Sequence, residues 1–250
     1  MQTTIVAILI AAGAATVAAD ELRVMSAGAV EPGLVRRIEQ FNRSSGHTVQ
    51  VEFGTGPQLT ARLAGGQTGD VLIAPKAVMD QAAADRAVNV PTRTTVGRVG
   101  VGIVIRGAAP APDVSSVDHL RTALLAADTV VYNRGSSGAY IERLLTQLGV
   151  ANQIASKVVR VENGDAVMQR LIAGKGTEIG FGAITEIRLF ESRGARLLAP
   201  LPDAVQNFTA YDAAVMAATR APQAAAEFVR FITTPEARSV FAAVGVQAPE

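Results

Sequence analysis

The 250-residue chain carries 23 Lys and Arg against 22 Asp and Glu, for a formal net charge of +1, and it contains no cysteine. Near balance of charge, with the basic residues scattered along the chain, argues against a nucleic-acid surface. The lack of cysteine excludes disulfides, thiolate catalysis and cysteine-based metal centres. We therefore expect a small molecule or another protein as partner, and neither a metal nor a cofactor.

Residues 1–19 have the character of a signal peptide. They contain no charged side chain, an apolar run at Ile5–Ile10, and the ending Val17-Ala18-Ala19 before Asp20. This small-x-small ending predicts cleavage after Ala19 and a periplasmic location. A buried helix and an uncleaved anchor remain alternatives, because the segment has no Lys or Arg. No later stretch has the length and hydropathy of a transmembrane helix.

From Glu21 the chain alternates strand-like and helix-like segments. Short or alternating apolar runs mark the strands, and apolar residues three and four apart mark the helices. The first series has predicted strands at Leu22–Met25, Val49–Phe53 and Val71–Ala74 and predicted helices at Pro32–Asn42, Pro57–Leu63 and Lys76–Ala84. This βαβαβα order predicts a mainly parallel sheet covered by helices.

A second series of the same kind follows. Predicted strands at Val99–Ile105, Thr129–Tyr132, Val158–Val161 and Ile179–Ala183 alternate with predicted helices at Val117–Ala127, Ser137–Leu148, Ala166–Ala173 and Ile184–Ser192. The chain ends with a strand near Tyr211–Ala217 and helices at about Pro222–Thr233 and Pro235–Val244. Two successive α/β series without a long linker predict two α/β lobes.

Signatures of an enzyme are weak. The two histidines, His47 and His119, lie in no metal-ligand spacing, and no GxSxG nucleophile elbow is present. We expect both histidines to be polar surface residues. The glycines from Gly97 to Gly102 resemble a dinucleotide fingerprint only superficially, because they begin a strand and do not lead from a strand into a helix. The sequence predicts that the chain is not an enzyme.

Four small, polar, glycine-rich turns follow predicted strands. They span residues 26–29, 54–56, 134–138 and 162–165. Such turns lie at the carboxyl ends of parallel strands, where ligands bind. The helix N-termini there expose unpaired N–H groups that favour anions. Any one of these turns alone reads as an ordinary helix cap, but four of them divided between two series indicate an anion-binding cleft.

The order of these motifs resembles the periplasmic molybdate-binding proteins of ABC transporters, which are type II periplasmic binding proteins. The resemblance covers essentially the whole mature chain and rests on Leu22–Ala29, Phe53–Gly56, Gly69–Ala74, Ser136–Tyr140, Ile179–Gly182, Phe228–Ile232 and Thr234–Ala237. It implies two α/β lobes with mixed, mainly parallel sheets joined by two hinge crossings. Lobe 1 comprises residues 20–96 and 211–250, and lobe 2 residues 97–210. Such a protein, expected here as a monomer, delivers its ligand to a membrane permease and transforms nothing.

The resemblance also implies where a ligand is held. The implied ligand-binding residues are Ala27, Gly28, Ala29, Thr55, Gly56, Arg134, Ser136, Ser137, Asp165 and Ala183. Molybdate-binding proteins place serines at the positions of Ala29 and Gly56 and a tyrosine at that of Ala183, so this chain departs from the pattern. Asp165 is a further departure, because two unit charges about 4 Å apart repel by roughly 4 kcal/mol at an effective dielectric of 20. Either Arg134 or Arg160 compensates for it, or Asp165 caps the following helix.

These departures favour a ligand larger than a tetrahedral oxyanion, since the loss of the tyrosine enlarges the pocket. We expect a small organic acid whose carboxylate meets Ser136, Ser137 and Arg134, while Asp165 takes a hydroxyl or amine. Molybdate or tungstate binding, and a sensor subunit of a membrane receptor, are the alternatives. A hydrolase using Ser136 or Ser137 is opposed by the lack of a recognisable base.

Overall fold

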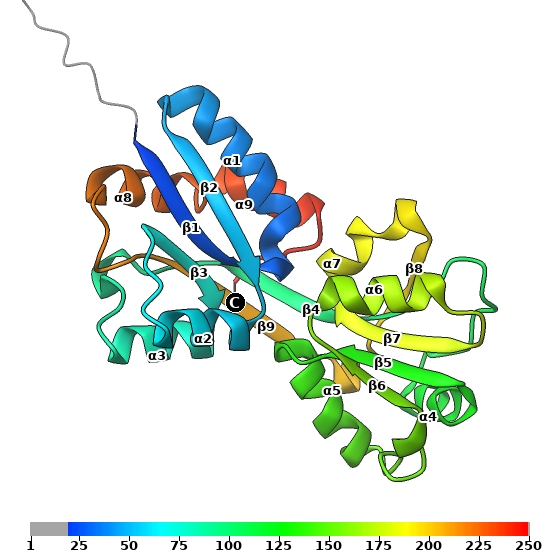
Figure 1. Ribbon diagram of the computed structural model, residues 1–250. Helices are drawn as coiled ribbons and strands as arrows, with labels where there is room; N and C mark the ends of the chain where they lie inside the picture. The colour runs from blue at the N-terminus through cyan, green and yellow to red at the C-terminus, as the bar shows by residue number, and fades with distance from the viewer. Residues whose placement is uncertain (1–19, 250) are drawn as a thin grey trace, which may run out of the picture.

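The computed structural model describes residues 20–249, so the predicted signal peptide and its cleavage after Ala19 lie outside the described residues. Two α/β bodies lie side by side, joined by the strands β4 (Thr94–Arg106) and β9 (Phe208–Val215) (Figure 1). In the part of the chain that is described, no helix is long and apolar enough to cross a membrane.

The first body contains a sheet in the order β2-β1-β3-β9, in which β1 is parallel to both β2 and β3. Its elements are β1 (Glu21–Ala27), β2 (Thr48–Gly54), β3 (Val71–Pro75), α1 (Glu31–Ser45), α2 (Gly56–Ala64), α3 (Lys76–Ala84), α8 (Pro222–Phe231) and α9 (Pro235–Ala243). The C-terminal helices return to this body and pack beside α1 (Figure 1).

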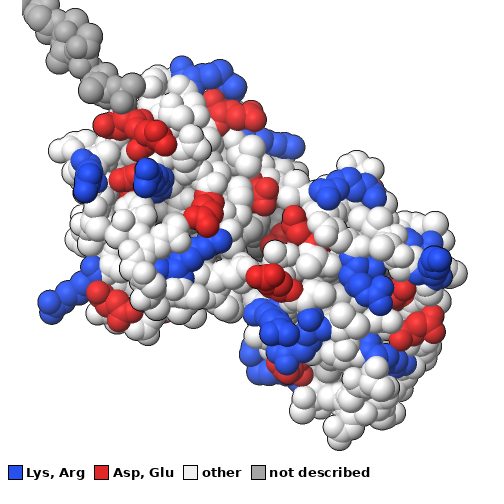
Figure 2. Space-filling model, in the orientation of Figure 1, with Lys and Arg blue, Asp and Glu red and all other residues white. Residues whose placement is uncertain are grey.

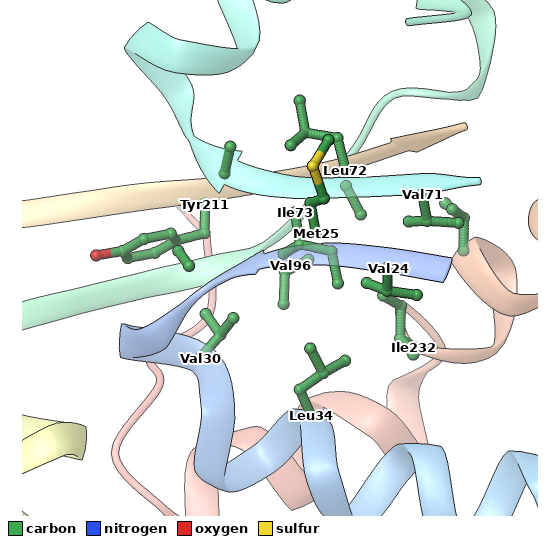
Figure 3. Close-up of a cluster of buried hydrophobic side chains, with 14 of the residues drawn as sticks. Val24, Met25, Val30, Leu34, Val71, Leu72, Ile73, Val96, Tyr211 and Ile232 are labelled. Atoms are coloured by element: carbon green, nitrogen blue, oxygen red, sulfur yellow. The ribbon is translucent and has the colours of Figure 1, made fainter. Parts of the chain in front are cut away.

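Apolar side chains from both faces of this sheet form its core (Figure 3). Val24 of β1, Leu72 of β3 and Leu34 of α1 are at most 2 % exposed, and burial of each such side chain contributes about 1.5–3 kcal/mol. Tyr211 of β9 lies at the end of the cluster, with its hydroxyl pointing away from the other side chains (Figure 3). The core therefore holds in place the strand ends from which the glycine-rich turns start.

The second body continues the sheet in the order β4-β7-β5-β6, with β8 on the other edge of β4. Its elements are α4 (Val117–Ala126), β5 (Thr129–Asn133), α5 (Ser136–Gln147), β6 (Val158–Val161), α6 (Gly164–Ala173), β7 (Glu178–Ala183), α7 (Ile184–Leu189) and β8 (Ala195–Pro200). β5 is parallel to β6 and β7. Separate apolar clusters fill the two faces of this part of the sheet.

The predicted two-part α/β fold is confirmed, with differences in detail. Among the strands of the described residues, the antiparallel pairings all involve β4 or β9, the strands that run between the bodies. β4 pairs with β9 as far as Gly100 and then with β7 and β8, so the boundary predicted after Val96 falls inside this strand and stays a prediction. β8 was not predicted, and the helix expected to reach Ser192 ends at Leu189.

The glycines from Gly97 to Gly102 and the histidine His47 have structural roles. The Gly97–Gly102 segment lies within β4, and a methyl group on Gly97 would lie 2.6 Å from the carbonyl oxygen of Gln247, so this glycine allows the C-terminal segment to pack closely. The expectation of two surface histidines was wrong for His47. It is 3 % exposed, its Nδ1 accepts a hydrogen bond from the Asp20 amide, and its ring stacks on Phe41. His119 is exposed and pairs with Asp113.

Candidate functional site

The turns after β1, β2, β5 and β7 converge on one cavity between the two bodies. Its lining consists of small or polar residues, namely Ala27, Gly28, Ala29, Gly54, Thr55, Gly56, Pro75, Asn133, Gly135, Ser136, Ser137, Ala183, Glu186 and Tyr211. The free volume is about 30 Å³. A ligand of several heavy atoms therefore needs the two bodies to separate before it enters.

The turn between β5 and α5 is held in shape by Asn133. This buried residue accepts a hydrogen bond from the Gly135 amide through its Oδ1 at 2.7 Å. A methyl group on Gly138 would overlap the carbonyl oxygen of Asn133, so only glycine lets the first turn of α5 lie this close to the strand. The contact places the start of α5 at the cavity wall.

Helix N-termini in the cavity differ in how their N–H groups are used. Thr55 caps α2, since its Oγ1 accepts from the Gln58 amide and the Gln58 side chain accepts from the Thr55 amide. No side chain caps α5 at Gly135 or α7 at Ala183. The first N–H groups of α5, beside Ser136 and Ser137, therefore remain available to an anion.

Glu186, in the first turn of α7, contributes the carboxyl group of the cavity wall. A methyl group on Gly28 would lie 3.1 Å from its Oε1, and one on Gly164 would overlap its Oε2. Desolvation and the nearby charge of Asp165 raise the pKa of Glu186 from 4.5 to about 7, although a hydrogen bond from the Ala183 amide opposes this shift. The carboxyl group is therefore divided between its neutral and charged forms near pH 7.

Further acidic groups surround Glu186. Glu31, at the start of α1, has its pKa raised by desolvation and by Asp165. The pKa of Tyr211 is raised by burial and by the charge of Glu186, against a hydrogen bond with Thr209. Figure 2 shows Asp and Glu side chains gathered where the two bodies meet. No Lys or Arg appears among the described residues that line the cavity, so no cationic side chain of the lining offsets the charge of Glu186.

Direct contacts hold the two bodies together around the cavity. Thr185 of α7 is fully buried and donates a hydrogen bond through Oγ1 to the carbonyl oxygen of Ala29 at 2.6 Å. On the other side, the side-chain Nε2 of Gln58 donates to Glu162 Oε1 at 3.1 Å. These contacts cross from one body to the other, so the structure represents a closed arrangement.

The structure brings eight of the ten predicted ligand residues into the cavity lining. They are Ala27, Gly28, Ala29, Thr55, Gly56, Ser136, Ser137 and Ala183. Arg134 and Asp165 are exposed and lie outside that lining. Their role as ligand contacts stays a prediction.

Of the two roles considered for Asp165, that of helix cap is wrong. Asn163 caps α6, because its Oδ1 accepts from the Ala166 amide at 2.9 Å. Ala183 lies in the cavity lining together with Glu186 and Tyr211, and the enlargement of the pocket expected from its small side chain stays a prediction.

Sequence reasoning missed Glu186, Tyr211 and Asn133. A signal for Glu186 was present: it lies three residues after the end of β7, at the position where a glutamate reaches back to the N-cap amide. No group of three or more potential metal ligands occurs within residues 20–249.

Comparison with known proteins adds family and fold. Residues 22–247 match the family model for bacterial extracellular solute-binding proteins. The chain is 25 % identical over 225 residues to an aconitate isomerase of Pseudomonas sp, covering 86 % of this chain and 83 % of that protein.

Solved structures of similar fold include the periplasmic molybdate-binding protein of Azotobacter vinelandii, with a TM-score of 0.77, 16 % identity and coverage of 92 % of this chain and 100 % of that one. The sulfate-binding protein SubI of Mycobacterium tuberculosis H37Rv matches with a TM-score of 0.72, 18 % identity and coverage of 92 % and 88 %. At these identities the structural matches establish a shared fold, that of type II periplasmic binding proteins. With nearly all of its described residues matched by the family model, the chain belongs to the bacterial extracellular solute-binding protein family.

Proposed function

We propose that this chain is the exported, monomeric solute-binding component of an ABC importer and that it captures a small organic acid without transforming it. The family and the convergence of strand-end turns on one interlobe cavity support capture of a solute. The ligand closes the bodies because it touches both only in the closed arrangement. A membrane permease is the partner that the proposal requires.

The observation that carries the choice of ligand is the Glu186 carboxyl group in the cavity wall. Two unit charges about 4 Å apart repel by roughly 4 kcal/mol at an effective dielectric of 20, so a charged carboxylate at that distance from a dianion costs roughly 8 kcal/mol. No lysine or arginine among the described lining residues offsets this repulsion. An organic acid avoids it by placing a carboxylate at the start of α5 and a hydroxyl or a shared proton at Glu186. The relative named aconitate isomerase supports an organic acid as the ligand, because aconitate is a tricarboxylate.

A thermal-shift panel on residues 20–250 tests the proposal. A ligand at 100 times its Kd adds about 2.7 kcal/mol to the free energy of unfolding, which corresponds to roughly 5 to 10 °C for a chain of this size. We expect such shifts with small di- and tricarboxylates and not with molybdate, tungstate or sulfate. Shifts confined to the inorganic oxyanions would overturn the choice of ligand and leave the solute-binding function intact.

A second candidate function is isomerisation of an unsaturated carboxylic acid, and the position and pKa of Glu186 favour it. In its charged form Glu186 takes a C–H proton beside the double bond, and the electron pair moves through the allylic system into a carboxylate of the substrate. The N–H groups at the start of α5 stabilise the resulting oxyanion. Glu186, now protonated, returns the proton to the other end of the allylic system. The proton removed from one carbon is returned to another, so the isomerisation needs no cofactor.

Incubation with cis-aconitate and, separately, with trans-aconitate, followed by proton NMR, separates the two candidates. If the chain is an isomerase, both substrates reach the same mixture, and Glu186→Gln abolishes turnover while retaining binding. If the spectra stay unchanged when the protein and the substrate are present at equal concentrations, isomerisation is refuted and solute binding remains as the function.

A further inference from the structure

Next to the inner cavity lies an outer groove with a different charge. It is lined by Thr55, Pro57, Gln58, Ala61, Arg134, Arg160 and Glu162 and has a volume of about 510 Å³. Thr55 lines both spaces, so they adjoin at the turn before α2. A ligand that extends past Thr55 passes from the first space into the second.

Arg134 has an unusual position relative to the two spaces. Its neighbours in sequence, Asn133 and Gly135, line the inner cavity, whereas its own exposed side chain lines the outer groove. Among the described residues, no carboxylate forms an ion pair with Arg134. The other charged groups of the groove are engaged: Arg160 pairs with Glu142 at 2.9 Å, and Glu162 accepts from Gln58 at 3.1 Å. Figure 2 shows basic side chains on the second body at the edge that faces the cleft.

We propose that the ligand carries at least two anionic groups, the second of which binds Arg134 in the outer groove. One carboxylate occupies the inner cavity at the start of α5, and the chain of the ligand passes Thr55. The guanidinium group of Arg134 then holds the second carboxylate through paired N–H donors. This inference rests on the proposed function, since it assigns a class, the di- and tricarboxylic acids, to the same site.

Two features favour this arrangement over a single carboxylate. The inner cavity has little room and contains Glu186, so it suits one anionic group with a proton shared at Glu186. Arg134, which forms no ion pair with a carboxylate of the described residues, lies where the outer groove meets the inner cavity. A second anionic group placed there is attracted, whereas a second one beside Glu186 is repelled. The charges of the inner cavity and the outer groove therefore select a ligand by its length as well as by its charge.

Titration calorimetry with propionate, succinate and tricarballylate tests the proposal, using residues 20–250, the Arg134→Gln variant and the control Arg121→Gln. Arg121 is an exposed arginine of α4 on the same body. We expect tricarballylate and succinate to bind wild type at least 10-fold more tightly than propionate. Arg134→Gln should weaken the two longer ligands by about 10- to 100-fold, the effect of losing hydrogen bonds between charged groups, and leave propionate within 2-fold. Arg121→Gln should change none of the three.

The outcomes separate this inference from the proposed function. Equal affinity for propionate and tricarballylate, or an equal loss for all ligands in Arg134→Gln, refutes the outer subsite and leaves capture of an organic acid in place. Failure of every carboxylate to bind refutes the proposed function, and the outer subsite with it. Circular dichroism of each variant verifies that the exposed substitution leaves the fold intact.

Discussion

Replacing Glu186 by Gln should change how the stability of the protein depends on pH. The pKa of this carboxyl group is raised from 4.5 to about 7 in the folded protein, and the unfolded chain restores the ordinary value. Between these two values the folded state holds a proton that the unfolded state has lost, so stability falls as the pH rises. Below pH 4.5 the group is neutral in both states, and its contribution to the free energy of unfolding is fully present. This contribution is lost as the pH rises through about 7.

The raised pKa sets the size of this effect. At about 1.4 kcal/mol per pKa unit, the rise from 4.5 to about 7 corresponds to about 3 kcal/mol. Glutamine retains an oxygen that accepts from the Ala183 amide but has no charge to bury. The free energy of unfolding of Glu186→Gln minus that of wild type should therefore increase by about 2 to 3 kcal/mol between pH 5 and pH 8. In melting temperature this corresponds to roughly 4 to 12 °C.

Urea unfolding and thermal melts of both proteins at half-unit steps from pH 4.5 to pH 8.5 measure the difference. Taking the difference removes the contributions of groups that titrate alike in both proteins. Glu191→Gln, which removes a carboxyl group at an exposed position on the same body, is the matched control. A difference for Glu186→Gln that does not change with pH would show that solvent reaches this carboxyl group and would refute the reasoning.

Further predictions concern closure and the cavity wall. Thr185→Val removes the buried hydrogen bond to Ala29 and should weaken ligand binding by about 5- to 30-fold in titration calorimetry, whereas exposed Thr146→Val should leave it unchanged. Ionised Glu186 favours separation of the bodies, so small-angle scattering should give a larger radius of gyration at pH 8.5 than at pH 5.5 for wild type and no change for Glu186→Gln. Gly56→Ala should weaken binding at least 10-fold without lowering the melting temperature, since its methyl group fits at 3.6 Å from Ser136 Oγ but narrows the cavity. Gly138→Ala should cost about 3 kcal/mol of stability by urea unfolding, since its methyl group overlaps the Asn133 carbonyl.

The parts of the site that could be predicted are those encoded locally. A glycine-rich turn after a buried strand and before an amphipathic helix is visible in sequence, and the parallel arrangement of strands then places such turns at one edge. This reasoning placed Gly28, Gly56 and Ser137 in one cavity lining. It worked because strand, turn and helix are adjacent along the chain.

The residues that were missed depend on contacts between distant segments. Tyr211 reaches the cavity because β9 returns antiparallel beside β3, where Tyr211 pairs with Pro75, and nothing near Tyr211 in sequence indicates that pairing. Glu186 lies against Gly28 of the other body, a contact between segments that are far apart in the sequence. From the sequence, Asp165 was expected to supply the acidic group of the site because it follows a strand-end turn, whereas Glu186 is inside a helix; Asp165 in fact lies outside the cavity lining.

Whether the cavity only binds or also isomerises depends on the protonation of Glu186 in the complex. A neutral Glu186 donates a hydrogen bond to a bound carboxylate, whereas only the charged form accepts a proton from carbon. A bound anion raises the pKa of a neighbouring carboxyl group. A ligand whose only anionic group lies in the inner cavity therefore shifts Glu186, with its pKa of about 7, toward the neutral form. This form favours binding without chemistry. A second anionic group drawn outward by Arg134 keeps its charge away from Glu186, and the guanidinium group opposes the rise in pKa. The outer groove therefore bears on both functions: it selects the ligand and sets how much of the bound state retains a carboxylate that can act as a base.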